Sequence, residues 1–320
     1  MSRRTRRLAL GVILLAIIAI VLVVILVIWL LQPAPPTPHG PPPSSTPTRP
    51  TAQPADCPDV LVLSVPGTWE SSATDDPYNP HANKHALLLR VTSHLQQDFP
   101  SSRAQVHTVP YKAQFQNPTN LNDHEATYND SRKQGYARAY GKLQNTYNHC
   151  PLTRYVLMGF SQGAVIVGDL AAGIGAGDGP IPAQDQDLVI GVGLIADGRR
   201  QSGEQHDVGP SPKGKGAEVV LGPFGSIVPG ITMTGARPGG FGTLEDRVYS
   251  ICAKGDLICD SPQFTNPLGA IGEFANAAQN PIHAMYATPK YWDDNGATAT
   301  MWMLGWSKQL VTNSPHPKHL

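Results

Sequence analysis

Apolar residues recur along this chain in two patterns, short apolar runs and longer stretches with helical spacing. The runs, typical of strands buried on both faces of a sheet, occupy residues 59–65, 104–110, 154–160, 187–196 and 246–252. Helical spacing occupies residues 81–99, 128–147, 164–172 and 297–311. In the last of these helices, we expect the core to include Met301, Leu304 and Leu310. Because strands and helices alternate, the pattern predicts an α/β domain, with a mostly parallel sheet covered by helices on both faces.

Residues 198–243 do not follow this alternation. They are dense in glycine and proline around a small apolar island, VVLGPFGSIVPGI. An irregular segment of this length inside a compact domain is usually functional or disordered. Two interpretations remain open, a cover or lipid-contacting flap over a functional site and a solvated insertion without a role.

The N-terminus carries the most apolar segment of the chain. The run from Leu8 to Leu31 would form roughly 36 Å of helix, which is enough to cross a hydrocarbon core of about 30 Å. The alternative is a cleavable signal peptide, whose apolar region is usually about 7–15 residues long and ends at a small-x-small site. Arginines at positions 3, 4, 6 and 7 predict a cytoplasmic N-terminus and an extracytoplasmic domain. We therefore expect residues 1–32 to anchor the protein in the cell membrane.

A proline-rich segment at residues 33–56 follows this predicted anchor. Residues 32–56 contain ten prolines and show no apolar periodicity, which is typical of extended polyproline II. We interpret the segment as a spacer without a partner. The α/β domain is then expected at residues 57–313, followed by a short tail at residues 314–320.

The charge of the chain argues against one class of function. The net charge is zero, only 15% of residues are charged, and no basic stripe is evident. A nucleic-acid-binding protein is expected to carry such a stripe, so we exclude that class.

Four cysteines are present, Cys57, Cys150, Cys252 and Cys259. An even number in a domain expected outside the cytoplasm favours disulfides. A bond between Cys252 and Cys259 would clamp one short loop. A zinc site is disfavoured because the pairs lack C-x-x-C spacing.

The segment VLMGFSQGAVIV places Ser161 between Gly159 and Gly163. It joins a predicted strand to a predicted helix, which is the context of a nucleophile elbow. The two glycines would relieve crowding where the helix passes close to the strand. A serine hydroxyl is a weak nucleophile alone, so it needs a base and a group that orients the base. Without such partners, Ser161 would be only a small residue in a tight turn.

Four histidines follow this serine in the chain, His206, His283, His316 and His319. The last two lie in the tail, and His206 lies in the glycine-rich insert. His283 comes after the last predicted strand and before the last predicted helix, where the histidine of a catalytic triad belongs. We therefore predict His283 as the base.

Two aspartates are candidates for the acid. Asp197 ends the strand after the nucleophile helix, and Asp256 follows the next strand in the segment CAKGDLIC. The acid must be held rigidly to keep the imidazole in its productive tautomer. A loop closed by Cys252 and Cys259 would give Asp256 that rigidity, although a simple turn aspartate would fit the same segment.

The segments GFSQG and CAKGDLIC, followed by a histidine, together resemble the cutinase family of serine esterases. Cysteines just before the first strand and before the nucleophile strand also match, and the resemblance covers nearly all of residues 57–312. It implies an α/β-hydrolase fold, a three-layer sandwich with a mostly parallel central sheet. It favours Asp256 over Asp197 as the acid of the triad. The disulfides that it implies are Cys57–Cys150 and Cys252–Cys259.

The same resemblance implies an oxyanion hole. One donor would be the backbone N–H of Gln162, directly after the nucleophile, and the second would come from the turn after the first strand, at Thr68. Family members commonly place a serine where this chain has threonine, which keeps the hydroxyl and adds a methyl group. An ordinary turn at the end of a strand is the alternative for this segment.

The predicted anchor, the proline-rich spacer and the insert resemble the membrane-anchored cutinase-like lipases of mycobacteria and related actinobacteria. This likeness implies hydrolysis of lipid esters and thioesters, with phospholipase A and thioesterase activity, in the metabolism of a mycolate-containing envelope. It implies no metal and no cofactor. Twenty-six residues separate Asp256 from His283, more than in cutinases, and with the insert they predict a larger or covered cleft that takes long lipid chains.

Two other functions remain possible at this stage. The same triad could transfer the acyl group to a lipid or sugar hydroxyl, which would make the protein an acyltransferase of envelope lipids. The domain could also be a non-catalytic lipid-binding ectodomain, but such a protein has no need to keep a serine, an acid and a histidine in this order.

Overall fold

The fold is known from a computed structural model, which describes residues 49–118, 120, 122–225, 228–262 and 280–320. The predicted anchor and most of the proline-rich spacer lie outside these residues. Within the described ranges, no helix combines the length and the apolar character needed to span a bilayer.

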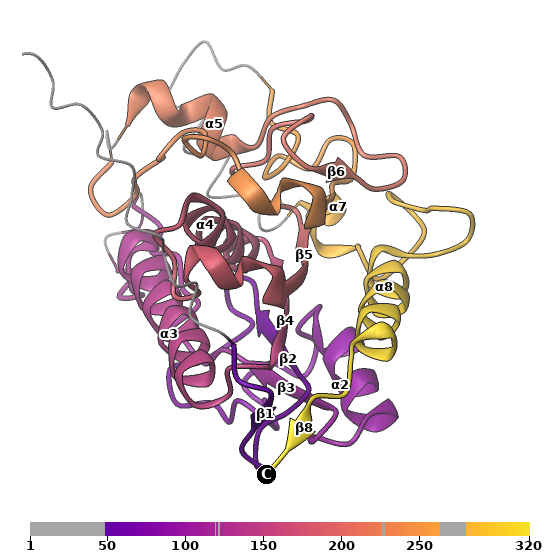
Figure 1. Cartoon of the computed structure of the whole chain (residues 1–320). Coiled ribbons are helices and arrows are strands. Elements are labelled where there is room, and N and C mark those ends of the chain that lie inside the picture. Colours follow the sequence, from indigo (N-terminus) through magenta and orange to yellow (C-terminus); the bar gives the residue numbers. More distant parts are fainter. Residues whose placement is uncertain (1–48, 119, 121, 226–227, 263–279) are drawn as a thin grey trace, which may run out of the picture. The chain divides into compact units, whose positions relative to one another are not determined.

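A parallel β-sheet forms the centre of the domain (Figure 1). Its strand order is β3-β2-β4-β5-β7-β6, and every neighbouring pair is parallel. The strand bounds are β2 Val60–Val65, β3 Ala104–Thr108, β4 Arg154–Phe160, β5 Val189–Ile195, β6 His206–Asp207 and β7 Val248–Ile251. The central strands are apolar and buried because helices cover both of their faces. The predicted α/β fold with a mostly parallel sheet is confirmed.

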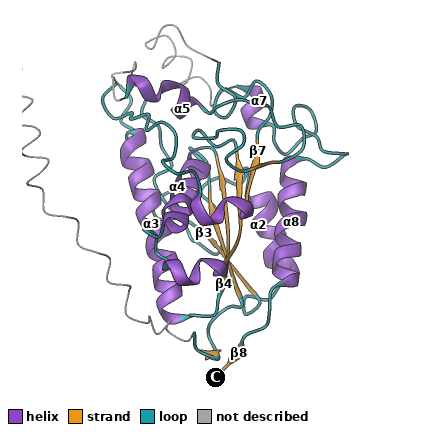
Figure 2. Ribbon diagram, turned by 45° about the horizontal axis from the view of Figure 1, so that its top comes forward, coloured by secondary structure: helices purple, strands orange, loops and turns teal. Residues whose placement is uncertain are grey.

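Two helices cover each face of the sheet (Figure 2). On one face lie α3 (Tyr128–His149) and α4 (Gln162–Ala176), and on the other lie α2 (Leu89–Asp98) and α8 (Ala299–Asn313). The side chain of Thr127 caps α3 by accepting from the N–H of Asp130. On both of its sides, α4 carries apolar residues, because it is enclosed by the sheet, α3 and the 3₁₀ turn η3 (Gly242–Arg247). The result is a three-layer arrangement with one hydrophobic core on each side of the sheet.

The burial of Met301 is a wrong prediction, because this side chain is 57% exposed. The buried face of α8 is formed by Ala299, Thr300, Met303, Ser307 and Val311. At about 100° per residue, Met301 lies about 200° from Met303, on the opposite side of the helix. The helix packs closely on β5, where a Cβ at Gly191 or Gly193 would meet α8 side chains at 2.5 Å. Small residues therefore take core positions that the apolar pattern assigned to larger ones.

Two further predictions differ from the structure at their ends. The helix expected at residues 81–99 begins only at Leu89, and turns precede it. Residues 49–56 belong to the compact domain, because β1 (Ala52–Gln53) pairs in parallel with β8 (Lys318–His319) in the segment expected to be a tail. In Figure 1 this small sheet lies at the bottom of the domain, far from α5 (Ala217–Leu221) and α7 (Pro281–Ala284) at the top.

Candidate active site

Ser161 lies in the turn between β4 and α4, with φ 55° and ψ −121°. A positive φ is a strained conformation for a residue with a side chain, and such strain is concentrated at functional sites. The turn requires glycine on both sides: a Cβ at Gly159 would lie 2.4 Å from the carbonyl oxygen of Gly163, and one at Gly163 would lie 2.0 Å from that of Val65. The local structure is the nucleophile elbow that the sequence predicted.

His283 approaches this serine from α7, a single helical turn. Asn280 caps that turn by accepting from the N–H of Ile282 at 2.9 Å. The Nε2 atom of His283 lies 2.9 Å from the Oγ of Ser161. The imidazole also stacks on the ring of Phe160, with centroids 5.0 Å apart. The base is therefore held by a capped turn on one side and by an aromatic ring on the other.

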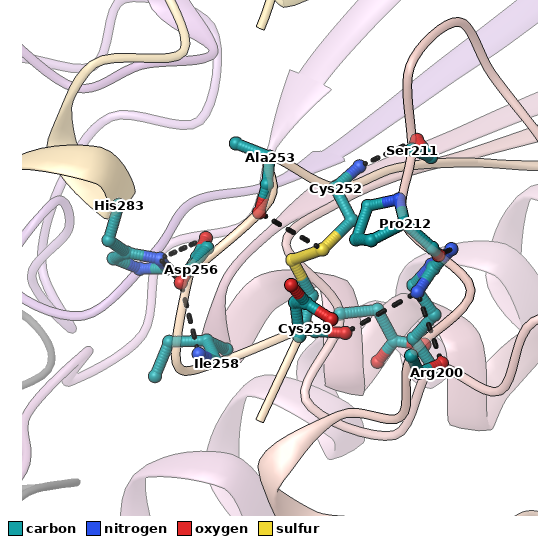
Figure 3. The surroundings of a disulfide bond; sticks show 12 residues. Arg200, Ser211, Pro212, Cys252, Ala253, Asp256, Ile258, Cys259 and His283 are labelled. Carbon is teal, nitrogen blue, oxygen red and sulfur yellow. Dashed lines mark hydrogen bonds and ion pairs between the residues drawn. A yellow bond between two sulfur atoms is a disulfide. The ribbon is translucent and has the colours of Figure 1, made fainter. Parts of the chain in front are cut away.

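Asp256 completes the triad with Ser161 and His283. It lies in the loop that the Cys252–Cys259 disulfide closes (Figure 3). Its Oδ2 lies 2.9 Å and its Oδ1 3.1 Å from the Nδ1 of His283. Oδ1 also accepts from the N–H of Ile258 at 3.0 Å, and Oδ2 from the hydroxyl of Tyr286 at 2.7 Å. Complete burial alone would raise the pKa of Asp256, but the charge of His283 and these hydrogen bonds outweigh it, so the pKa lies below its usual value. The carboxylate stays ionised and can orient the imidazole.

The structure separates the two acid candidates. Asp197 lies at the end of β5 and binds Arg237, with oxygen to nitrogen distances of 2.6 and 3.0 Å. Asp256, by contrast, contacts the imidazole of His283 directly. Only Asp256 is therefore placed to orient the base.

The other three histidines after Ser161 lie elsewhere. His206 stacks on Tyr249, with ring centroids 5.0 Å apart. His316 and His319 both contact the carboxylate of Asp59, at 2.8 and 3.0 Å, where β1 meets β8. His283 is the one downstream histidine that the structure brings to Ser161.

Tyr286 is a site residue that sequence reasoning missed. It is fully buried, its hydroxyl donates to Asp256, and the same oxygen accepts from the N–H of Ala253 at 2.9 Å. The one signal in the sequence is its position three residues after His283, which would place both side chains on the same side of a helical turn. No motif marks Tyr286. The role arises from the fold of the disulfide loop.

An apolar pocket opens beside the nucleophile. Its empty volume is about 480 Å³, part of which is open to solvent. Thr68 and Gln162, the two predicted oxyanion donors, line it together with Ser161 and His283. The N–H of Gln162 lies in the first turn of α4, where amides have no partner within the helix. The remaining lining residues are Trp69, Phe115, Tyr128, Val165, Gly198, Glu218 and Ile258.

The insert at 198–243 packs on the site and forms part of its wall. Gly198 and Glu218 line the pocket. The N–H of Ala217 donates to the carbonyl of Ile258 at 2.8 Å, and the hydroxyl of Ser211 accepts from the N–H of Cys252 at 3.1 Å (Figure 3). The described part of the insert therefore supports the loop that carries Asp256, and the interpretation of a solvated insertion without a role is wrong.

Buried ion pairs attach the insert to the helices beneath it. Asp169 of α4 pairs with three arginines, Arg132 of α3 and Arg199 and Arg237 of the insert. Arg132 also pairs with Glu218 at 3.0 Å. Burial alone would raise the pKa of Asp169, but the three guanidinium charges lower it below its usual value. Asp197, which pairs with Arg237, is the third carboxylate, so three carboxylates face three guanidinium groups.

Replacing Arg237 with methionine is expected to destabilise the domain by about 3–5 kcal/mol, because it breaks a buried ion pair and leaves the carboxylate of Asp197 without its charged partner. The measurement is the free energy of unfolding of the full chain in detergent micelles, from urea titrations. Arg90→Met is the matched control, since Arg90 is exposed on α2 and its loss should change stability by less than about 0.5 kcal/mol. Equal stability of the two variants would contradict the structural role of the network.

The predicted disulfides are present, Cys57–Cys150 and Cys252–Cys259. Among the described residues, one group of potential metal ligands is close enough to share an ion, Cys57, His149 and Cys150. Its two cysteines are bonded to each other, so they offer no thiolate.

Comparisons with known proteins agree with this fold. A model of the cutinase family matches residues 78–285. A carboxylesterase Culp6 homolog of Corynebacterium glutamicum is 47% identical over 272 residues, which cover 83% of this chain and 85% of that protein.

Two solved structures are also similar. The catalytic core domain of acetyl xylan esterase from Trichoderma reesei has a TM-score of 0.45 and 21% identity, over 72% of this chain and 99% of that one. A cutinase-like protein from Cryptococcus sp. has a TM-score of 0.44 and 17% identity, over 73% and 96%. The family match over more than half of the chain, together with the 47% identical relative, shows that this chain belongs to the cutinase family.

Proposed function

We propose that this protein is a serine carboxylesterase in which Ser161 is the nucleophile, His283 the general base and acid, and Asp256 the orienting acid. The observation that carries the proposal is the continuous relay, 2.9 Å from Oγ to Nε2 and 2.9 Å from Nδ1 to Oδ2, beside an apolar pocket. The 47% identical relative is described as a carboxylesterase, which supports the same activity.

The reaction follows from this geometry. The Oγ of Ser161 attacks the ester carbonyl carbon while Nε2 of His283 takes its proton. The N–H groups of Gln162 and Thr68 stabilise the oxyanion, and His283 then protonates the leaving alcohol or thiol. Water, deprotonated by the same imidazole, attacks the acyl-enzyme, and the acid is released as His283 returns the proton to the Oγ of Ser161. Throughout this cycle, Asp256 holds Nδ1 protonated and stabilises the imidazolium.

The substrates that we propose are lipid esters and thioesters, including phospholipids cut by phospholipase A activity. The pocket is largely apolar, and Phe115, Val165 and Ile258 contribute to its walls, which suits an acyl chain. The apolar run at residues 8–31 supports a cell-membrane location, with the catalytic domain outside the cytoplasm. We further propose a role in the lipid metabolism of a mycolate-containing envelope, in line with the corynebacterial relative.

The test uses the full chain in detergent micelles. Turnover is measured on p-nitrophenyl esters of graded acyl length, on phosphatidylcholine and on an acyl thioester. An organophosphonate probe is added in parallel, and the labelled peptide is identified by mass spectrometry. Turnover with the label on Ser161 supports the proposal, whereas neither turnover nor label contradicts it. Label without hydrolysis, but with ester formation on an added alcohol, would make the protein an acyltransferase.

A further inference from the structure

The turn after β2 carries the second predicted oxyanion donor, Thr68. The N–H of Glu70 donates to the carbonyl of Gly67 at 3.1 Å, and Trp69 has a φ of 62°. A β-turn with a positive φ only at its third residue is a type II turn, in which the second residue keeps its N–H free of the turn. Within the described residues, Thr68 makes no hydrogen bond, so its amide and hydroxyl are available in the pocket that Ser161 lines.

The carboxylate of Glu70 holds this turn through two hydrogen bonds. Its Oε2 accepts from the N–H of Gly67 at 2.8 Å, and its Oε1 accepts from the N–H of Leu87 at 2.7 Å. One carboxylate therefore joins the start of the turn to the segment that leads into α2. The turn is also confined by Phe160, whose ring would lie 2.8 Å from a Cβ at Gly67. This is the same ring that stacks on His283.

The two hydrogen bonds favour the ionised form of the side chain. A carboxylate can accept with both oxygens, whereas a protonated carboxyl uses one of them as a donor. Burial raises the pKa of Glu70 above its usual value, although both N–H donors and the charge of His283 act in the opposite direction. Keeping this buried carboxylate ionised therefore costs free energy. Such a cost is expected for a carboxylate whose role is to hold the backbone in position.

We propose that Glu70 is a positioning residue of the esterase: its carboxylate holds the Gly67–Glu70 turn so that the donors of Thr68 stay directed at the oxyanion. This inference rests on the proposed function. The competing role is a through-space effect of the negative charge on the imidazolium of His283, and the experiment separates the two.

The first step compares Glu70→Gln with the wild type, both as full chains in detergent micelles, on a soluble short-chain ester. Glutamine keeps the shape, but its amide group faces one of the two N–H donors. We expect kcat to fall about 10²-fold, the size of the loss of one oxyanion donor, with KM changed by less than about threefold. An unchanged kcat in Glu70→Gln would overturn the inference. A wild type without hydrolysis would instead remove the proposed function on which the inference rests.

The second step is a double-mutant cycle with Thr68→Pro, which deletes the amide donor. Proline is favoured at the second position of a type II turn, so the backbone is retained. If Glu70 acts through Thr68, adding Glu70→Gln to Thr68→Pro should lower kcat by less than about threefold more. Losses that multiply would show that Glu70 acts on His283 and overturn the positioning role. If proline prevents folding, Thr68→Val, which removes the hydroxyl and keeps the amide, takes its place. One of the two donors is then already absent, so adding Glu70→Gln should cost less kcat than it costs in the wild type, and an equal loss would overturn the positioning role.

Discussion

Replacing Ser161 with alanine should lower kcat for a short-chain ester by about 10⁵–10⁶-fold, the largest effect expected of any single substitution in this chain. The hydroxyl oxygen forms the covalent intermediate, and among the described residues it is the hydroxyl that lies within hydrogen-bond distance of Nε2 of His283. Alanine keeps the Cβ, so the strained φ of 55° and the contacts of the elbow are unchanged. KM should therefore change little. The measurement is steady-state hydrolysis by the full chain in detergent micelles.

The matched control is Ser101→Ala, because Ser101 is an exposed serine in the turn before β3. It should keep wild-type activity and wild-type labelling by an organophosphonate, whereas Ser161→Ala should lose both. A Ser161→Ala protein that retained more than about a hundredth of the wild-type kcat would place the nucleophile elsewhere.

The strands of the sheet are the part of the fold that the sequence predicts best. Residues 154–160 match β4 at both ends, because the run lacks polar residues after Arg154 and a turn closes it on each side. Strands β1, β6 and β8 were not predicted, since each has two residues and shows no periodicity. Their pairing depends on segments far away in the chain, such as residues 52–53 with 318–319.

The candidate site likewise has a part that the sequence predicts and a part that it does not. The position of Ser161 follows from a local motif, since two glycines and an elbow can be identified from adjacent residues. The choice between Asp197 and Asp256 does not follow from a local motif, because both aspartates follow a strand. Asp197 instead forms an ion pair with Arg237, which lies forty residues further along the chain in a segment without a regular pattern. Long-range ion pairs of this kind leave no periodic signal in a single sequence.

The packing of the insert could not be predicted from the sequence either. Its glycines and prolines suggested either a flap or a loop without a role. Its attachment depends on charged side chains that are buried only because their partners on α3 and α4 are buried with them. Charged residues are usually predicted to be exposed, so the sequence alone favours the opposite placement.

Replacing Asp256 with asparagine should lower kcat by about 10⁴-fold and leave the fold intact. The carboxylate now accepts from Ile258 with one oxygen and from Tyr286 with the other. The N–H of Ile258 can only donate, so the asparagine oxygen is expected to face it. The asparagine NH₂ group then faces the hydroxyl of Tyr286, which can accept, and Nδ1 of His283. An imidazole that accepts at Nδ1 carries its proton on Nε2 and cannot take one from Ser161.

The matched variant is Asp197→Asn, which changes the other acid candidate in the same way. This substitution removes the negative charge beside Arg237, so the variant should be less stable than the wild type, but its kcat should stay within about tenfold. Steady-state kinetics and thermal midpoints of both full-length variants separate activity from stability. A loss of about 10⁴-fold in Asp197→Asn, with Asp256→Asn nearly active, would reverse the assignment of the acid. With the expected result, Asp256 orients the base and Asp197 stabilises the insert, so two aspartates at neighbouring strand ends have separate roles set by their partners.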